Sequence, residues 1–286
     1  MSRVAIVTCE GHDVDPDSPL LLSALEAADM PAELVIWDDQ HVDWETYDLC
    51  VIRSTWNYSS RLDEFLRWAE GVERLENPFP VVKFSCDKHY LGELAERGHA
   101  VVPTTFCDVG AEPVFPEGDF VVKPCVGVGS IDAARYRDNE HAAARHHVAS
   151  LHESGRDVLI QPYVQSVDVV GERALIFVAG TFAHAMTKAA LLNTPPDERD
   201  WLFRREQMSV AVAEPSAVAF AQGVLDELGY HNLLYARVDL VGVDGGWAVM
   251  ELELVEPSLF LSYDAETTRR LAEAIKHRVI NATPRR

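Results

Sequence analysis

Charged side chains alternate with apolar ones in two neighbouring segments toward the C-terminal end of the sequence. The first segment carries Arg237 and Asp239 two residues apart, and the second carries Glu251 and Glu253. Successive side chains on a β-strand point to opposite faces, so two adjacent strands would put three carboxylates on one face. Carboxylate oxygens suit Mg²⁺, particularly when substrate phosphates complete its coordination, and Mn²⁺ accepts the same ligands. This pattern predicts a divalent-cation site at Asp239, Glu251 and Glu253; the alternative is a hairpin with a solvated polar face.

Lysine is rare in this chain, which makes the position of each lysine informative. Five of the 25 basic residues are lysines, and Lys123 and Lys188 lie in apolar, strand-like segments. Burying an ammonium group costs on the order of several kcal/mol unless an anion meets it. Lys123 is followed by Gly127, Gly129 and Ser130, whose backbone can approach phosphate oxygens closely. The combination predicts a polyphosphate site, whereas the Gly-x-Gly sequence alone fits a plain hairpin turn equally well.

The composition argues against several classes of partner. With 46 acidic and 25 basic residues, the net charge is −21, and so acidic a surface repels nucleic acids and anionic membranes. The five cysteines form no C-x-x-C pair, so we expect free thiols in a reducing cytoplasm. The apolar run at the N-terminus is short for a signal peptide, and no run approaches a membrane span. We therefore expect a soluble, cytoplasmic protein with no nucleic-acid or membrane partner.

Strand and helix patterns alternate at the start of the chain. The expected strands are residues 4–8, 32–37 and 49–53, and the expected helices are residues 20–28 and 63–75. Such alternation implies a parallel sheet covered by helices, in which ligands bind beyond the carboxyl ends of the strands. This rule makes Arg53, Ser54, Trp56 and Tyr58 candidate substrate-binding residues. Alternatively, Arg53 is a structural partner of Asp48, and Trp56 packs in the core.

The remainder of the sequence favours strands. We expect helices at residues 87–97 and 265–279 and strands at residues 120–124, 158–164, 171–178 and 181–187. The proline-rich residues 77–80 indicate a subdomain boundary. Residues 193–207 are polar and have no clear period, which is typical of a lid over a functional site.

Short segments spread over most of the chain form a recognisable pattern. They are RSTWNY (53–58), DKHYL (87–91), VPT (102–104), VVKP (121–124), QPY (161–163), GE (171–172), HAMTK (184–188), YARVD (235–239) and ELELVEPSLF (251–260). The chain resembles the ATP-grasp superfamily of carboxylate–amine ligases, and within it the cycloserine synthetase-like (O-ureido-serine cyclo-ligase) group. The resemblance implies a mixed α/β, ATP-grasp fold. It implies an N-terminal parallel-sheet domain on the substrate side (1–83), a small central lid domain with the lysines and glycine loop (84–167), and a C-terminal antiparallel-sheet domain with the Mg²⁺ site (168–286).

The resemblance also implies roles for the basic residues. Lys88 and Lys123 would hold the ATP phosphates, and Lys188 and Arg237 would face the transferring γ-phosphate and the acyl-phosphate intermediate. Arg204 is a candidate substrate-facing arginine, in a loop that lacks the glycines expected of the cycloserine-type group. The predicted metal ligands match the superfamily pattern, with Glu-x-Glu where many members have Glu-x-Asn.

Recognition of the nucleoside is implied by the same likeness. Gln161, with the backbone of Tyr163 and Val164, would form the hinge that reads the adenine edge. Glu172 is similar to the acid that holds the ribose hydroxyls, but Asp168 has a competing spacing, and the sequence leaves both open.

The implied reaction is ATP-dependent formation of an amide bond. An amino-acid-type carboxylate would be activated as an acyl phosphate and attacked by an amine, with release of ADP and phosphate, in the making of a specialised metabolite such as an antibiotic. Positioning and charge stabilisation would provide most of the catalysis. The alternatives are an ATP-grasp phosphotransferase acting on a hydroxyl or carboxylate, and a non-catalytic nucleotide-binding module, which the intact carboxylate set argues against. The resemblance further suggests a homodimer or homotetramer.

Overall fold

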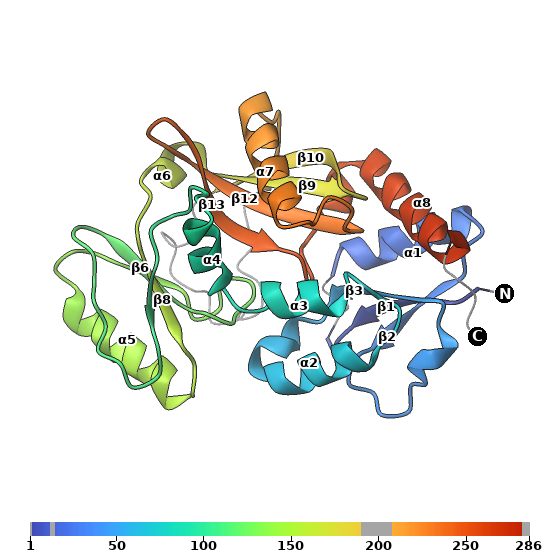
Figure 1. Ribbon diagram of the computed structural model, residues 1–286, viewed down its shortest axis with the longest axis horizontal. Coiled ribbons are helices and arrows are strands. Elements are labelled where there is room, and N and C mark those ends of the chain that lie inside the picture. Colours follow the sequence, from blue (N-terminus) through green and yellow to red (C-terminus); the bar gives the residue numbers. More distant parts are fainter. Residues whose placement is uncertain (1, 12–14, 190–207, 282–286) are drawn as a thin grey trace.

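The computed structural model describes residues 2–11, 15–189 and 208–281. Three β-sheets form its framework, and helices cover their faces (Figure 1). The fold is mixed α/β, with a parallel N-terminal sheet and an antiparallel C-terminal sheet as predicted, and the central sheet is also antiparallel. None of the helices in the described part of the chain has the length and apolar character needed to cross a membrane.

The N-terminal sheet is parallel and has the strand order β2-β1-β3-β4. Its strands are β1 (Val4–Thr8), β2 (Ala32–Ile36), β3 (Leu49–Ser54) and β4 (Leu75–Glu76). The helices α1 (Asp17–Ala27) and α2 (Leu62–Gly71) accompany it, with 3₁₀ turns at Trp44–Thr46 and Trp56–Ser60. Strand β1 is buried along its whole length, which explains its unbroken apolar sequence. The predicted helix 63–75 is too long, because the chain is extended at Val72 and Leu75 joins the sheet as β4.

The central sheet is antiparallel and has the order β5-β8-β6-β7. Its strands are β5 (Thr105–Cys107), β6 (Phe120–Pro124), β7 (Ala134–Tyr136) and β8 (Val158–Pro162). Helix α5 (His141–Glu153), which the sequence pattern did not lead us to predict, lies on the outer face of this sheet (Figure 1). Ala144, Val148 and Leu151 of α5 pack against Phe120 and Ile160 of the sheet. This small core is separate from those of the other two sheets.

The C-terminal sheet is antiparallel and has the order β11-β10-β9-β12-β13. Its strands are β9 (Glu172–Val178), β10 (Thr181–Lys188), β11 (Met208–Ala211), β12 (Tyr235–Val243) and β13 (Gly246–Glu253). Helix α7 (Pro215–Glu227), also not predicted, covers one face, and α8 (Ala265–Asn281) covers the other beside α1 (Figure 1). Residues of β9 alternate between these two cores, with Leu175 facing α7 and Ile176 facing α8.

Short helices and buried polar side chains join the sheets. The remaining elements are α3 (Phe79–Ser85), α4 (Tyr90–Glu96), α6 (Ser166–Val170) and a 3₁₀ turn at Leu261–Tyr263. The Tyr235 hydroxyl lies 2.8 Å from the carbonyl oxygens of both Ile52 and Val255. Asn77 donates to the carbonyls of Tyr235 and Leu254 at 2.9 and 2.8 Å. The carboxyl end of β3 is therefore held directly against β12 and the chain that follows β13.

Each sheet lies within one of the three predicted domain ranges, 1–83, 84–167 and 168–286. The apolar cores do not follow these ranges. Val4 and Ile6 of β1 share a core with Ile176 of β9 and with Leu271 and Ile275 of α8. The first and third ranges are thus packed as one body, and the exact boundaries stay a prediction.

Candidate active site

The two charged segments identified in the sequence lie side by side on β12 and β13. Arg237 stands opposite Glu253, and Asp239 opposite Glu251, in the antiparallel register. One carboxylate oxygen from each of Asp239, Glu251 and Glu253 lies within 4.8 Å of the others. The structure confirms that these three carboxylates meet, and their binding of a metal ion stays a prediction. We refer to Asp239, Glu251 and Glu253 as the carboxylate cluster.

Arg237 bridges two members of this cluster. Its Nε and Nη2 donate to the two carboxylate oxygens of Asp239 at 2.9 and 3.0 Å, and Nη2 also pairs with Glu253. Nη1 donates to the Ser258 carbonyl at 3.2 Å. A lysine could not reproduce this planar fork of donors. Arg237 therefore holds Asp239 in a defined orientation while it neutralises part of the cluster.

Lys188 reaches the cluster from β10. Its Nζ lies 3.0 Å from Oδ2 of Asp239 and 3.5 Å from Oε2 of Glu172, the residue opposite it on β9. Lys188 and Asp239 are both buried. The structure thus brings together Lys188, Arg237 and Glu172, which are far apart in the sequence.

Lys88 contacts the opposite side of the cluster. Its Nζ lies 3.0 Å from Oε1 of Glu251 and donates to the Gly127 carbonyl at 2.9 Å. Gly127 belongs to the connection between the antiparallel strands β6 and β7, so the glycine loop is a hairpin connection that also contacts a predicted ATP lysine. Gly129 and Ser130 in this loop have φ values of +59° and +60°, a left-handed conformation that favours glycine.

Lys123 lies on β6 and makes no ion pair with any residue that the structure describes. Burial lowers the pKa of Lys123, and the negative charge of Glu251 partly opposes this effect. A buried ammonium group of this kind gains most from an added anion. The position fits the predicted contact with an ATP phosphate.

The carboxyl groups of the site differ in their pKa values. Burial raises the pKa of Glu253 to about 8, although Arg237 opposes the rise. Burial also raises the pKa of Glu256 to about 7, with Lys88 opposing it. Burial disfavours ionisation of Asp239 as well, but Arg237 and Lys188 outweigh it and hold its pKa below the ordinary value. Burial therefore favours the protonated forms of Glu253 and Glu256, and a cation bound at this oxygen-only donor set would displace the proton of Glu253.

Comparison with known proteins identifies the family. The family model for the N-terminal domain of the D-cycloserine synthetase DcsG matches residues 4–77. The cycloserine biosynthesis protein DcsG of Streptomyces lavendulae is 37% identical over 301 residues, which cover 98% of this chain and 99% of that protein. The chain belongs to the DcsG family.

Solved structures agree with membership of the DcsG family. The crystal structure of D-cycloserine synthetase DcsG has a TM-score of 0.86 at 35% identity, covering 97% of this chain and 100% of that one. A D-alanine–D-alanine ligase from Bacillus anthracis has a TM-score of 0.66 at 14% identity, over 98% of each chain, and shows the shared fold. This DcsG-family chain is accordingly an enzyme of the ATP-grasp ligase class.

The predicted adenine hinge of this DcsG-family chain lies on β8 and beyond it. Gln161 is buried, and its side-chain amide donates to Oγ1 of Thr104 at 2.9 Å. The backbone N–H of Tyr163 donates to the Asp119 carbonyl at 2.7 Å. These two groups thus have protein partners, and their part in adenine recognition stays a prediction. Val164 follows them directly, and its contact with adenine stays a prediction.

The two candidates for the ribose acid have different surroundings. Asp168 lies on α6, where it accepts from the Tyr163 hydroxyl and lies 3.3 Å from Arg135. Glu172 lies beside Lys188 in the site, where burial raises its pKa and Lys188 opposes the rise. Glu172 is thus an ion-pair partner of Lys188, and neither ribose role is tested by this geometry.

Arg53 lies at the carboxyl end of β3, as predicted, but it is only 2% exposed. Its Nη2 donates to the Pro257 carbonyl at 2.6 Å and lies 3.7 Å from Oδ2 of Asp17. Asp48, which we considered as the structural partner of Arg53, instead accepts a hydrogen bond from the backbone N–H of Arg3. The prediction of an Arg53–Asp48 pair was therefore wrong, because α1 rather than the start of β3 supplies the acid.

The other predicted substrate residues lie deeper than expected. Ser54 is buried, with its Oγ 2.8 Å from Oγ1 of Thr8. Tyr58 stacks on Phe65 with ring centroids 4.9 Å apart, and Trp56 packs against the same core. Trp56 is partly buried there, so the core position considered for it is only partly met. Ser54 and Tyr58 also act as packing residues at the strand end, so their contact with substrate stays an unsupported prediction.

Some predictions lie outside the described residues, and some site residues were missed. Arg204 and the expected lid at residues 193–207 belong to the part of the chain that the structure does not describe. Glu256, whose pKa burial raises and the charge of Lys88 partly lowers, was not among the predicted site residues. The repeated acids of the Glu-x-Glu-x-x-Glu sequence were the available signal for it. Ser85 and Tyr90, whose hydroxyls bond the backbone of Leu252, had no such signal.

Proposed function

We propose that this chain is an ATP-dependent ligase that activates an amino-acid-type carboxylate as an acyl phosphate and forms an amide when an amine attacks it. ADP and phosphate are released. The observation that carries the proposal is the carboxylate cluster with Lys88, Lys188 and Arg237 in direct contact with it. Such a site provides both a metal position and cations for a polyphosphate.

The protein's own residues bind and orient the reactants. Lys88 and Lys123 bind ATP phosphates, while Lys188 and Arg237 stabilise negative charge on the transferring γ-phosphate and on the acyl phosphate. When bound by Asp239, Glu251 and Glu253, Mg²⁺ or Mn²⁺ would neutralise phosphate charge and withdraw electrons from the reacting phosphorus. The side chains of Lys88, Lys188 and Arg237 exchange their present carboxylate partners for phosphate oxygens as ATP binds.

The guanidinium group of Arg53 is the proposed binding site for the substrate carboxylate. Its Nε and Nη1 are buried and have no hydrogen-bond partner among the residues that the structure describes, and the same holds for Oγ1 of Thr55. Buried N–H groups without acceptors are costly, and Nε and Nη1 lie on different edges of the guanidinium group, so one carboxylate would accept from one of them at a time. An amino-acid-like substrate whose acid group lies against Arg53 would give one of these donors an acceptor.

The relationship to a cycloserine biosynthesis protein indicates the kind of product. We propose that the amide closes a ring within one amino-acid-like molecule, in an antibiotic-type pathway, and that the chain works in the cytoplasm. The five cysteines are free thiols, in keeping with a reducing compartment. A homodimer or homotetramer is the proposed assembly, and light scattering coupled to gel filtration measures it directly.

The experiment is to incubate the enzyme with Mg-ATP and a panel of free amino acids and ring-closing precursors, singly and in pairs, and to follow ADP release and product mass. A product lighter than its substrate by one water, formed together with ADP, is the expected result. A product that instead gains a phosphoryl group would show that the enzyme is a phosphotransferase and not a ligase. Glu251→Gln measured in parallel shows whether the turnover belongs to this site.

A further inference from the structure

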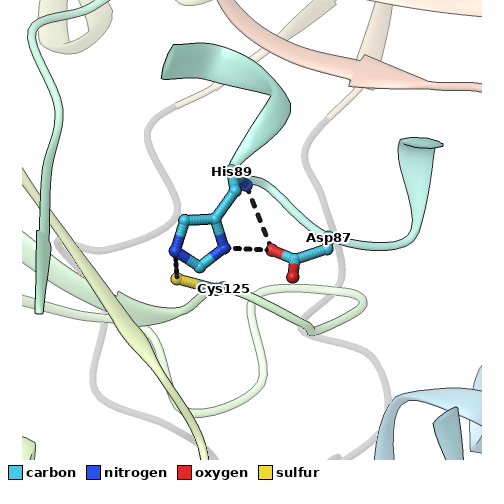
Figure 2. Close-up of side chains that lie close together, drawn as sticks. All are labelled: Asp87, His89 and Cys125. Atoms are coloured by element: carbon cyan, nitrogen blue, oxygen red, sulfur yellow. Dashed lines mark hydrogen bonds and ion pairs between the residues drawn. The ribbon is translucent and has the colours of Figure 1, made fainter. Parts of the chain in front are cut away.

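A second group of potential metal ligands lies close to the ATP lysines and apart from the carboxylate cluster. Asp87, His89 and Cys125 each offer one ligand atom, and these atoms lie within 4.8 Å of one another (Figure 2). Asp87 and His89 flank Lys88 in the sequence, and Cys125 follows Lys123 by two residues. None of the three has a part in the proposed reaction.

Asp87 fixes the orientation of the imidazole. Its Oδ1 lies 3.1 Å from the backbone nitrogen of His89 and 2.6 Å from the ring Nδ1 (Figure 2). The ring of Phe106 stacks on the imidazole with centroids 4.4 Å apart. A carboxylate at Nδ1 places the proton there and leaves the lone pair on Nε2. Proteins orient metal-binding histidines in this way.

Two further potential metal ligands lie near the Nε2 atom of His89. Sγ of Cys125 and Oδ1 of Asp108 each lie 4.0 Å from it. In a tetrahedral zinc site, bonds of about 2.0 to 2.3 Å place nitrogen roughly 3.6 Å from sulfur and about 3.3 Å from oxygen. The two distances to Nε2 thus exceed these tetrahedral values by less than about 1 Å. The Asp108 side chain is 79% exposed, so it can move to close the site.

We propose that Cys125, His89 and Asp108 bind one Zn²⁺ ion, with Asp87 as the hydrogen-bond partner of the ligating histidine. A thiolate and an imidazole select zinc over magnesium, so this site differs in its metal from the carboxylate cluster. Binding converts the Cys125 thiol to a thiolate and releases one proton per ion.

The zinc ion would link the two segments that carry the ATP lysines. The backbone N–H of Lys88 already donates to the Cys125 carbonyl at 3.0 Å, and a His89–zinc–Cys125 bridge adds a second link at the same point. This link joins the start of α4 to the end of β6 and so fixes the spacing of Lys88 and Lys123. This structural role rests on the proposed function, because it concerns the ATP site.

The test is a titration of the purified full-length chain with Co²⁺, which replaces Zn²⁺ and absorbs light. One equivalent of Co²⁺ is expected to produce a thiolate-to-cobalt charge-transfer band that added Zn²⁺ removes. Cys125→Ser and His89→Gln are expected to weaken Co²⁺ binding at least about tenfold, and Asp87→Asn by about 10–100-fold, as for other partners of ligating histidines. Cys107→Ser is the matched control: the Cys107 thiol donates to the Ala111 carbonyl at 3.5 Å, serine preserves that donor, and the band is expected to remain.

Absence of the band from the wild-type chain, or its survival in both Cys125→Ser and His89→Gln, overturns the proposal. His89 is partly exposed, so His89→Gln provides a folded variant if Cys125→Ser fails to fold, and circular dichroism establishes which variants are folded. Co²⁺ on carboxylates alone gives no thiolate band. The band therefore reports on the zinc site whether or not ADP release supports the ligase.

Discussion

Lys88 and Glu251 form an ion pair, with Nζ and Oε1 3.0 Å apart, between the turn before α4 and strand β13. Lys88 also donates to the Gly127 carbonyl in the β6–β7 loop. One lysine therefore connects the carboxylate cluster to the glycine loop. When ATP binds, this lysine is well placed to exchange Glu251 for a phosphate oxygen and free the carboxylate for Mg²⁺.

Glu251→Gln is expected to remove turnover while the chain stays folded. Glutamine keeps the shape of the side chain, and Lys88 keeps its bond to Gly127, but a predicted metal ligand and one negative charge are lost. We expect kcat to fall by at least about 10²–10³-fold, as when one key electrostatic contact is removed. Steady-state ADP release measures this, with Glu273→Gln on the exposed face of α8 as control. Near-normal activity of Glu251→Gln would mean that the metal site lies elsewhere.

Asn77→Ala is expected to lower the free energy of unfolding by roughly 2–4 kcal/mol. The amide of Asn77 donates to the Tyr235 and Leu254 carbonyls and accepts from the Leu234 N–H at 3.1 Å, so alanine leaves three buried backbone groups without partners. Urea denaturation measures the change. The exposed Asn281→Ala should differ from wild type by no more than about 0.5 kcal/mol. Equal stability of the two variants would show that the buried contacts of Asn77 contribute little.

Gly171→Ala and Gly223→Ala are expected to have opposite effects. Gly171 has φ +71°, and a Cβ there would lie 2.5 Å from the Lys188 carbonyl oxygen, so alanine displaces β10 and with it the Lys188 side chain. Both stability and kcat should fall. Gly223 lies within α7 with nothing near its Cβ position, and alanine there should stabilise by about 0.5–1 kcal/mol. Thermal unfolding measures the stability of the two variants, and ADP release measures their kcat. An unchanged kcat in folded Gly171→Ala would contradict the predicted role of Lys188.

The stability of the chain is expected to fall as the pH falls below about 6.5, partly because of His184. Burial lowers the pKa of His184, with Asp264 opposing the effect, so the unfolded chain takes up a proton before the folded chain does. His184 thus contributes stability above its unfolded pKa, which is lost as the pH falls through the folded pKa. The loss is at most about 1.4 kcal/mol per pH unit, the limit for one proton.

His184→Gln isolates this contribution. Its unfolding free energy should depend less steeply on pH than that of the wild type between pH values of about 5 and 7. Urea denaturation at a series of pH values measures both slopes. Parallel slopes would show that His184, whose Nδ1 lies 2.9 Å from the Thr267 hydroxyl, is not held neutral in the folded chain.

The amino-acid sequence by itself determined the strands of five or more residues and the pairs of residues that share a strand face. A period of two was enough to place Arg237 with Asp239 and Glu251 with Glu253, and an apolar setting was enough to single out Lys123 and Lys188. These inferences succeed because side-chain direction on a strand follows from backbone geometry alone. The helices α5 and α7 were missed although their buried residues recur at helical spacing, as in Ala144, Val148 and Leu151 of α5, because further alanines on their other faces weaken the contrast of the apolar pattern.

The tertiary structure alone decided the contacts between distant segments. It paired Arg53 with Asp17 rather than Asp48, brought Lys88 to Glu251, and placed Cys125 beside His89. Each contact depends on how the sheets and their connecting helices pack, and packing depends on the shapes of many apolar side chains at once. Spacing along the chain does not determine that geometry, so the sequence predicted candidate residues for the chemistry, while the fold decided which of them meet.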